Sequence, residues 1–80
     1  MKDTLLFILK NIVEFPDDIV VDESTNGDST TLTIHANQSD LGKVIGKSGR
    51  IIRAIRDLIK LMAAKQGVYV DVVIAEDVPA

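Results

Sequence analysis

A glycine-bounded tetrapeptide, Gly46-Lys47-Ser48-Gly49, interrupts two stretches that otherwise have the sequence pattern of helices. Glycine has no Cβ, so both glycines can adopt positive φ angles and let the backbone of a ligand lie against the main chain. The helix expected after the turn would direct unpaired N–H groups and the positive end of its dipole toward the same place. The sequence therefore predicts a helix-turn-helix whose turn suits phosphate groups.

Basic residues gather around this turn although the chain as a whole is acidic. The nine lysines and arginines are outnumbered by twelve acidic residues, which gives a formal net charge of -3. Between positions 43 and 65, however, Asp57 is the only acidic residue. A phosphate at the turn would feel mainly its neighbours, because the Debye length is about 8 Å at physiological salt. A solvated helix face is the alternative interpretation. The basic residues of this segment are Lys43, Lys47, Arg50, Arg53, Arg56, Lys60 and Lys65.

Composition limits the class of protein. A length of 80 residues predicts one domain, 1–80, which at this size buries only about 60% of its unfolded surface. The chain has no cysteine, one histidine and no carboxylate pair spaced for acid–base chemistry, so we expect no enzyme, no metal site and no cofactor. The apolar run Leu5–Leu9 is too short for a membrane span or a signal peptide. We therefore expect a soluble, cytoplasmic protein with no membrane partner.

The first segment has the periodicity of an amphipathic helix resting on a core. Asp3 or Thr4 is available as its cap. Pro16 is expected to end it, because proline disfavours helical geometry in the preceding residue, Phe15. Its apolar side consists of Leu5, Leu6, Ile8, Leu9, Ile12 and Val13.

A β-hairpin is predicted next. Two segments with strand character, Ile19–Thr25 and Ser29–Asn37, flank Asn26-Gly27, a dipeptide favoured in tight hairpin turns. In the second segment, apolar and polar residues alternate, which predicts one buried and one solvated face. The alternation places His35 on the solvated face, where we expect a passive surface side chain.

Two helices and a strand complete the pattern. Ser39-Asp40 is expected to cap a short helix ending near Ile45, and Ser48 a long helix from about Arg50 to Gln66, with Gly67 as its stop. The apolar arc of the long helix spans about 200°, wider than the ~100° stripe that one core requires. Its second contact is either the preceding helix or another protein chain, for which the candidate residues are Ala54, Leu58 and Leu61.

The last segment, Val68–Ala75, alternates like a strand, and residues 76–80 are expected to fray. A right-handed crossover would place this strand parallel to the second strand of the hairpin. The resulting fold class is α+β, in the order helix, strand, strand, helix, helix, strand. We expect a three-stranded mixed sheet with three helices on one face.

The region Leu41–Ile55 resembles the core signature of a KH domain. The resemblance is carried by Val44-Ile45-Gly46-Lys47-Ser48-Gly49 followed by Ile51-Ile52. A Gly-X-X-Gly sequence alone is common, but its position between two amphipathic helices flanked by strands is more specific. The order of elements is that of the type II arrangement, and the resemblance extends over the whole chain, as in small bacterial KH proteins of the KhpA type.

The resemblance implies that the glycine turn clamps about four nucleotides of single-stranded RNA by their backbone, beside an apolar groove. It implies an RNA chaperone or post-transcriptional regulator that acts with a partner, either a second copy or a KhpB (Jag)-type KH protein. The hairpin turn Thr25–Asp28 would form the variable loop across the groove, and its acidity predicts low affinity. Whether Val44, Ile45 and Ile52 belong to the groove or to the core is left open. The implied nucleic-acid-binding residues are Lys43, Val44, Ile45, Gly46, Lys47, Ser48, Gly49, Arg50 and Arg53.

Two other functions compete with this interpretation. Gly46-Lys47-Ser48 copies the end of a Walker A loop, but only three residues separate Gly42 from Gly46 where that motif needs four, and a helix is expected where it needs a strand. We exclude an NTPase on this ground. A protein-interaction module, in which the apolar face of helix 50–66 binds a partner chain and nucleic-acid binding is secondary, stays an alternative. The sequence does not distinguish RNA from single-stranded DNA.

Overall fold

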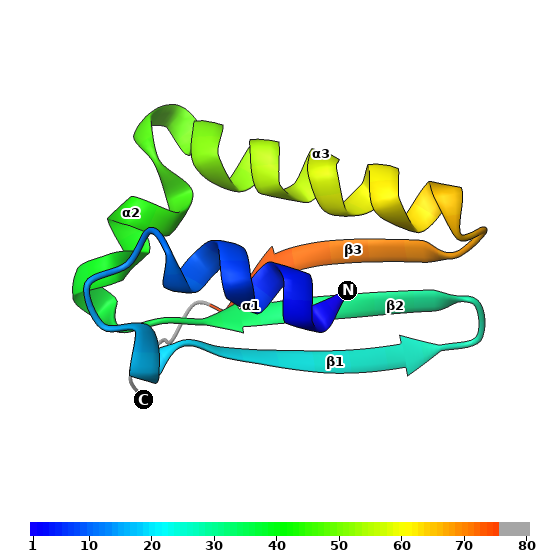
Figure 1. The fold of residues 1–80 in the computed structure, drawn as a ribbon, viewed down its shortest axis with the longest axis horizontal. Helices are drawn as coiled ribbons and strands as arrows, with labels where there is room; N and C mark the ends of the chain where they lie inside the picture. The colour runs from blue at the N-terminus through cyan, green and yellow to red at the C-terminus, as the bar shows by residue number, and fades with distance from the viewer. Residues whose placement is uncertain (76–80) are drawn as a thin grey trace.

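The computed structural model describes residues 1–75, and its elements follow the predicted α-β-β-α-α-β order (Figure 1). The expectation that residues 76–80 fray lies outside the described residues. Short 3-10 turns precede β1, α2 and α3. The helices are α1 (Lys2–Lys10), α2 (Leu41–Ile45) and α3 (Arg50–Lys65), and the strands are β1 (Val20–Asn26), β2 (Ser29–His35) and β3 (Tyr69–Ile74).

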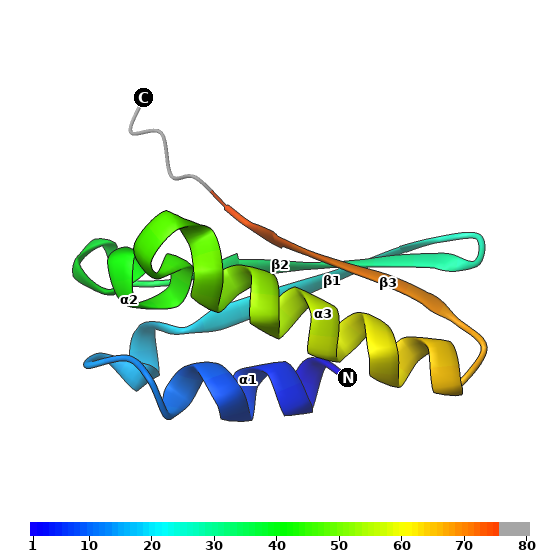
Figure 2. The ribbon, with the colours of Figure 1, turned by 90° about the horizontal axis from the view of Figure 1, so that it is seen from above.

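The strands form one mixed sheet in the order β1-β2-β3. β1 pairs with β2 in antiparallel orientation, and β3 pairs with β2 in parallel orientation, which requires the crossover through α2 and α3. Figure 2 shows α1 and α3 on the same side of the sheet. The chain therefore has the predicted α+β fold with the three-stranded mixed sheet of a type II KH domain.

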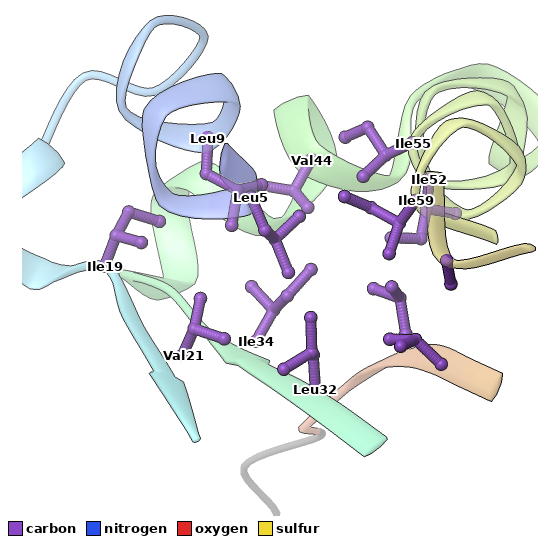
Figure 3. Packing of buried hydrophobic residues seen from close by; sticks show 13 residues of the cluster. Leu5, Leu9, Ile19, Val21, Leu32, Ile34, Val44, Ile52, Ile55 and Ile59 are labelled. Atoms are coloured by element: carbon purple, nitrogen blue, oxygen red, sulfur yellow. The ribbon is translucent and has the colours of Figure 1, made fainter. Parts of the chain in front are cut away.

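The core lies between this face of the sheet and the helices (Figure 3). All three helices and all three strands contribute apolar side chains to it, and Val44 is the contribution of α2. The residues are Leu5, Leu9, Ile19, Val21, Leu32, Ile34, Val44, Ile52, Ile55, Ile59, Ala63, Val70 and Val72.

α1 is shorter than the sequence predicted. It ends at Lys10 rather than near Pro16, and its N-cap is Met1 without a side-chain hydrogen bond, so neither Asp3 nor Thr4 caps it. The backbone N–H groups of Glu14 and Phe15 instead donate to Asp40, at 3.0 and 2.9 Å. These N–H groups therefore bond to a side chain that is distant in the sequence. They do not continue α1, although the apolar periodicity predicted a longer helix.

Asp40 does not cap α2 through its side chain, contrary to expectation. Its side chain is fully buried, and its two carboxylate oxygens join the segment before β1 to the start of α2. Asn37 makes the local turn instead, since its side chain accepts from the Ser39 N–H at 2.9 Å. A buried carboxylate needs such partners, because leaving it unpaired would be costly.

The turns are partly as predicted. The hairpin turn is Gly27-Asp28 rather than Asn26-Gly27, because Asn26 and Ser29 still pair as strand residues. Gly67 ends α3 with φ +73°, as expected, and the N–H groups of Gly67 and Val68 bond to Ala64 and Ala63 carbonyls in a Schellman motif.

Candidate nucleic-acid interface

The glycine loop between α2 and α3 has an unusual backbone. Gly46 has φ +76° and ψ 172°, and Gly49 has φ +73° and ψ 18°. Ser48 lies between them at φ +58°, the only non-glycine residue with positive φ among residues 1–75. Ser48 therefore does not act as the predicted side-chain cap of α3, and the N-cap position belongs to Gly49. Three of the four loop residues thus have positive φ angles.

The two glycines have different surroundings. A Cβ at Gly46 would lie 2.5 Å from Cγ1 of Ile51, so the protein's own packing requires glycine there. Among residues 1–75, nothing lies within 4 Å of a Cβ built at Gly49. Close approach of a ligand is therefore open at Gly49, whereas the Cβ side of Gly46 is filled by Ile51.

Burial distinguishes the apolar candidate residues that belong to the core from the one that is exposed. Val44 is fully buried and Ile52 is 9% exposed, and both belong to the hydrophobic core. Ile45 is 37% exposed at the C-terminal end of α2, directly before the loop. Val44 therefore belongs to the core beneath the loop, whereas Ile45 is an exposed apolar side chain next to the loop.

The basic residues divide into paired and unpaired groups. Lys43 lies 3.5 Å from Glu14 and 3.8 Å from Asp40. None of the ion pairs within residues 1–75 includes Lys47, Arg50 or Arg53, which are all exposed. No acidic residue stands in the first turn of α3, so the positive end of its dipole adds to the same potential.

Sequence reasoning missed the acidic partners of the basic helix. Arg56 and Lys60 lie 3.8 and 3.7 Å from Oδ1 of Asp71 on β3, and Lys43 is paired through Asp40 and Glu14. Asp40 lies only three positions before Lys43, but Glu14 and Asp71 come from distant parts of the chain, so no local pattern indicates the contacts that they make. Of the seven basic residues in this segment, the ones near the loop that make no ion pair within residues 1–75 are therefore Lys47, Arg50 and Arg53.

The acidic hairpin does not lie across from the glycine loop. Gly27 and Asp28 line a pocket of about 520 Å³ together with Gly67 and Val68, which places the hairpin turn at the C-terminal end of α3. Figure 1 shows the glycine loop before the opposite end of α3, about 24 Å away along a helix of 16 residues. The prediction that the acidic hairpin turn lies across the groove from the glycine loop is therefore wrong.

Comparison with known proteins identifies the fold and the family together. The sequence profile of the KhpA/KhpB KH domain matches residues 2–74. This chain belongs to the KhpA/KhpB KH-domain family. The glycine loop, where the sequence resembled a KH signature, is therefore part of a KH domain. It forms the turn between α2 and α3.

The relatives match over nearly their whole length. RNA-binding protein KhpA of Chlamydia caviae is 38% identical over 77 residues, which cover 96% of this chain and 99% of the relative. RNA-binding protein KhpA of Clostridium acetobutylicum is 46% identical over 66 residues, 82% of this chain and 88% of the relative. The KhpA protein of Listeria monocytogenes is 37% identical over 65 residues, 81% and 86% of the two chains.

A solved structure shows the same fold in a larger protein. A variant of Aquifex aeolicus Era bound to GDP.AlF4- superposes with a TM-score of 0.60 at 15% identity. The match covers 95% of this chain and 31% of the Era chain, so this KH-family chain spans about a third of that protein. At this identity, the likeness concerns the fold alone.

A second surface of this KH domain is apolar and uncovered. Ile51, Leu58 and Leu61 on α3 are 39%, 46% and 69% exposed, and Ala54 is exposed between them. Their spacing places them on one side of α3, next to its buried face, since Ile51 and Leu58 lie four and three positions from the buried Ile55. We call these four residues the α3 stripe. The preceding helix, α2, contacts α3 but leaves this stripe exposed. Contact with α2 therefore does not account for the full width of the apolar arc of α3.

Other kinds of site find no support within residues 1–75. The part of the chain that the structure describes contains no cluster of three His, Cys, Asp or Glu side chains able to hold a metal ion. His35 lies on the helix-free face of the sheet, with Nε2 2.7 Å from Oδ2 of Asp22, a partner that the sequence did not reveal. Within the same residues, none of the helices has the length and apolar character needed to cross a membrane.

Proposed function

We propose that this chain binds single-stranded RNA at the Gly46–Gly49 loop, with the sugar-phosphate backbone lying against the main chain at Gly49. The observation that carries the proposal is the open space at Gly49 beside cations that make no ion pair with an acid of residues 1–75. These cations are Lys47, Arg50 and Arg53. The name of the relatives, RNA-binding protein, supports the same class of ligand.

The residues at the loop are expected to contact different parts of the nucleotide. Lys47 and Ser48, both exposed, would contact phosphate oxygens, and α3 would direct its first N–H groups toward the same anions. Ile45 would offer an apolar contact to a base. Backbone contacts of this kind position a strand without choosing its sequence, so we expect weak sequence preference.

With few free cations, a single domain should bind weakly. Lys43 contributes less than the sequence suggested, because Glu14 and Asp40 already lie beside it. Tight binding would then require two linked domains, since a second attachment raises the effective concentration of the first. This arrangement fits a small RNA chaperone or post-transcriptional regulator that acts with a partner chain.

A salt titration tests the proposal. Neutralising two or three phosphates of a single strand predicts that log affinity falls with log salt at a slope of about -1.4 to -2.1. Fluorescence anisotropy of a labelled ten-nucleotide RNA, measured between 50 and roughly 300 mM salt, gives this slope. A slope near zero, or no binding in low salt, would contradict the proposal.

The α3 stripe supports a second function, association with another protein chain. Its side chains are too exposed for a core role, and this chain matches the family that contains both KhpA and KhpB. A second copy, or a KhpB (Jag)-type protein, would bury the stripe against its own apolar helix. The stripe and the cations near the loop consist of different residues, so each proposal can be tested by substitutions that leave the other set of side chains unchanged.

Leu61→Glu is expected to weaken self-association by at least tenfold, because it would bury a charge in an apolar interface. Sedimentation equilibrium at tens of micromolar compares the variant with the parent chain. Phe7→Glu is the matched control, since Phe7 is 71% exposed on α1 and lies outside the stripe. A parent chain that sediments only as a monomer would leave a different protein as the partner.

A further inference from the structure

A hollow lies at the end of the molecule opposite to the glycine loop. The β1–β2 turn forms one wall and the connection from α3 to β3 forms the other, and Figure 1 and Figure 2 show both at this end. Its volume of about 520 Å³ falls within the roughly 300–1,000 Å³ of typical ligand pockets. We call it the hairpin pocket, and it is lined by Thr25, Gly27, Asp28, Thr30 and residues 67–69. Neither the glycine loop nor the α3 stripe contributes a residue to it, so it is a separate surface.

The wall that comes from the α3–β3 connection is apolar and uncovered. Val68 and Tyr69 are 47% and 58% exposed, and Tyr69 begins β3 opposite Ser29 of β2. A long polar side chain can lay its methylene groups along such a surface while its polar end reaches further. A flat cationic group gains in addition from contact with an aromatic ring. This wall therefore suits a side chain with an apolar stem and a planar, charged end.

The hairpin wall offers hydrogen-bond acceptors. The hydroxyls of Thr25 and Thr30 lie 3.2 Å apart, on directly paired residues of β1 and β2. One hydroxyl donates to the other, which leaves lone pairs on both oxygens. Asp28 adds a carboxylate that makes no ion pair within residues 1–75. The group that complements this wall is therefore rich in hydrogen-bond donors.

Negative charge predominates around the pocket. A smaller hollow of about 170 Å³ shares Thr30 and Val68 with it, and Glu23 is the charged side chain that lines this hollow. Among the described residues, no lysine or arginine lines either hollow. The negative end of the α3 dipole also lies here, although Lys65 stands in the last helical turn. These charges disfavour a nucleic acid and favour a cation.

We propose that the hairpin pocket binds an arginine side chain of a partner protein. The guanidinium would pair with Asp28 through its fork of N–H donors and stack on Tyr69, while its stem passes Val68. A guanidinium has five donors and no acceptor, which matches the acceptors of the hairpin wall. Lysine fits less well, because its compact ammonium does not combine paired donors with a flat face. The proposal does not depend on RNA binding at the glycine loop.

A second copy of this chain is a poor occupant. Its arginines without an ion pair, Arg50 and Arg53, lie at the glycine-loop end of α3, whereas the pocket lies at the other end. A contact between these ends would join copies head to tail, which gives open filaments unless the rotation closes a ring. The arginine is therefore assigned to a different protein.

A peptide titration followed by NMR tests the proposal. The full chain, labelled with ¹⁵N, is titrated with an acetylated and amidated Gly-Arg-Gly peptide. We expect a dissociation constant on the order of 1 mM, because a single side chain buries little surface. The amide shifts of residues 27, 28 and 67–69 should change with added peptide, and those of residues 46–50 should not. Replacing the arginine of the peptide with lysine should weaken binding by at least about threefold.

Two substitutions test the individual contacts. Asp28→Asn should weaken binding of the arginine peptide by roughly five- to tenfold, because it removes a charged hydrogen-bond acceptor. Asp17→Asn is the matched control: Asp17 is exposed, makes no ion pair within residues 1–75 and precedes β1, about 23 Å from the hairpin turn along the strand. Tyr69→Leu should cost about two- to fivefold, whereas Tyr69→Phe, which keeps the ring, should bind like the parent chain.

Four results would overturn the proposal. The first is equal affinity of the Asp28→Asn and Asp17→Asn chains, and the second is equal binding of the lysine and arginine peptides. The third is a titration in which millimolar peptide shifts no amide of the pocket. The fourth is a change of the same amide shifts on dilution without peptide, which would assign the pocket to a second copy. Binding of RNA is measured separately, so each of these results leaves the proposed function at the glycine loop intact.

Discussion

Gly49→Asp is expected to weaken the binding of single-stranded RNA by at least about thirtyfold, which corresponds to about 2 kcal/mol. The new carboxylate would stand in the open space where a phosphate is proposed to lie. Two like charges about 4 Å apart near a protein surface repel by as much as ~4 kcal/mol, so the loss should exceed that of a simple steric change. Anisotropy titration of a labelled RNA measures it.

The variant should still fold. Aspartate tolerates left-handed backbone better than most residues, and Gly49 is the N-cap of α3, where aspartate is a favourable residue. Gly67→Asp is the matched control: Gly67 has the same φ of +73° and equally open surroundings, but it lies at the other end of α3. The control should bind RNA like the parent chain. Equal losses in both variants would show that net charge, rather than the loop, governs binding.

Gly46→Ala is expected to lower the free energy of unfolding by about 2–5 kcal/mol, because it combines backbone strain with overpacking. Its φ of +76° and ψ of 172° lie in a region that is nearly exclusive to glycine, and the added Cβ would be 2.5 Å from Cγ1 of Ile51. A domain of this size has only about 4–12 kcal/mol of stability, so a large share would be lost. Urea denaturation monitored by circular dichroism measures the change.

Gly42→Ala provides the control for this stability measurement. Gly42 lies inside α2, and no described residue comes within 4 Å of an added Cβ, so alanine there should stabilise the protein by about 0.5–1 kcal/mol. A double variant, Gly46→Ala with Ile51→Ala, should lose less than the sum of the two single variants, because the clash is partly relieved. Strict additivity would show that Ile51 does not enforce glycine at position 46.

The two glycines of the loop therefore have separate roles, a distinction that the motif by itself does not make. We expect Gly46 to be needed for folding, because Ile51 fills the space beside it. Gly49 is proposed to contact the ligand, because the space beside it is open among the described residues. In a functional study, loss of RNA binding in a Gly46 variant would have to be separated from loss of folded protein, whereas a Gly49 variant reports on the site directly.

Local sequence determined the elements of this protein and their order. Helical and strand periodicity, the turn at Gly67 and the Gly46–Gly49 motif depend on residues within a few positions of one another, so they could be predicted from the chain alone. The parallel pairing of β3 with β2 also followed, because a crossover through two helices permits few other arrangements. The same signals identified the KH resemblance and the position of the candidate site.

Tertiary structure decided which of the candidate residues are available. Asp40 accepts from backbone groups 26 and 25 positions away, which shortens α1, and Arg56 reaches a carbonyl 16 positions away on β3. Val44 was assigned to the core and Ile45 to the surface by the same packing. Charge and hydropathy along the chain do not contain this information, because the partner of a cation or an apolar side chain is set by the elements that fold against it.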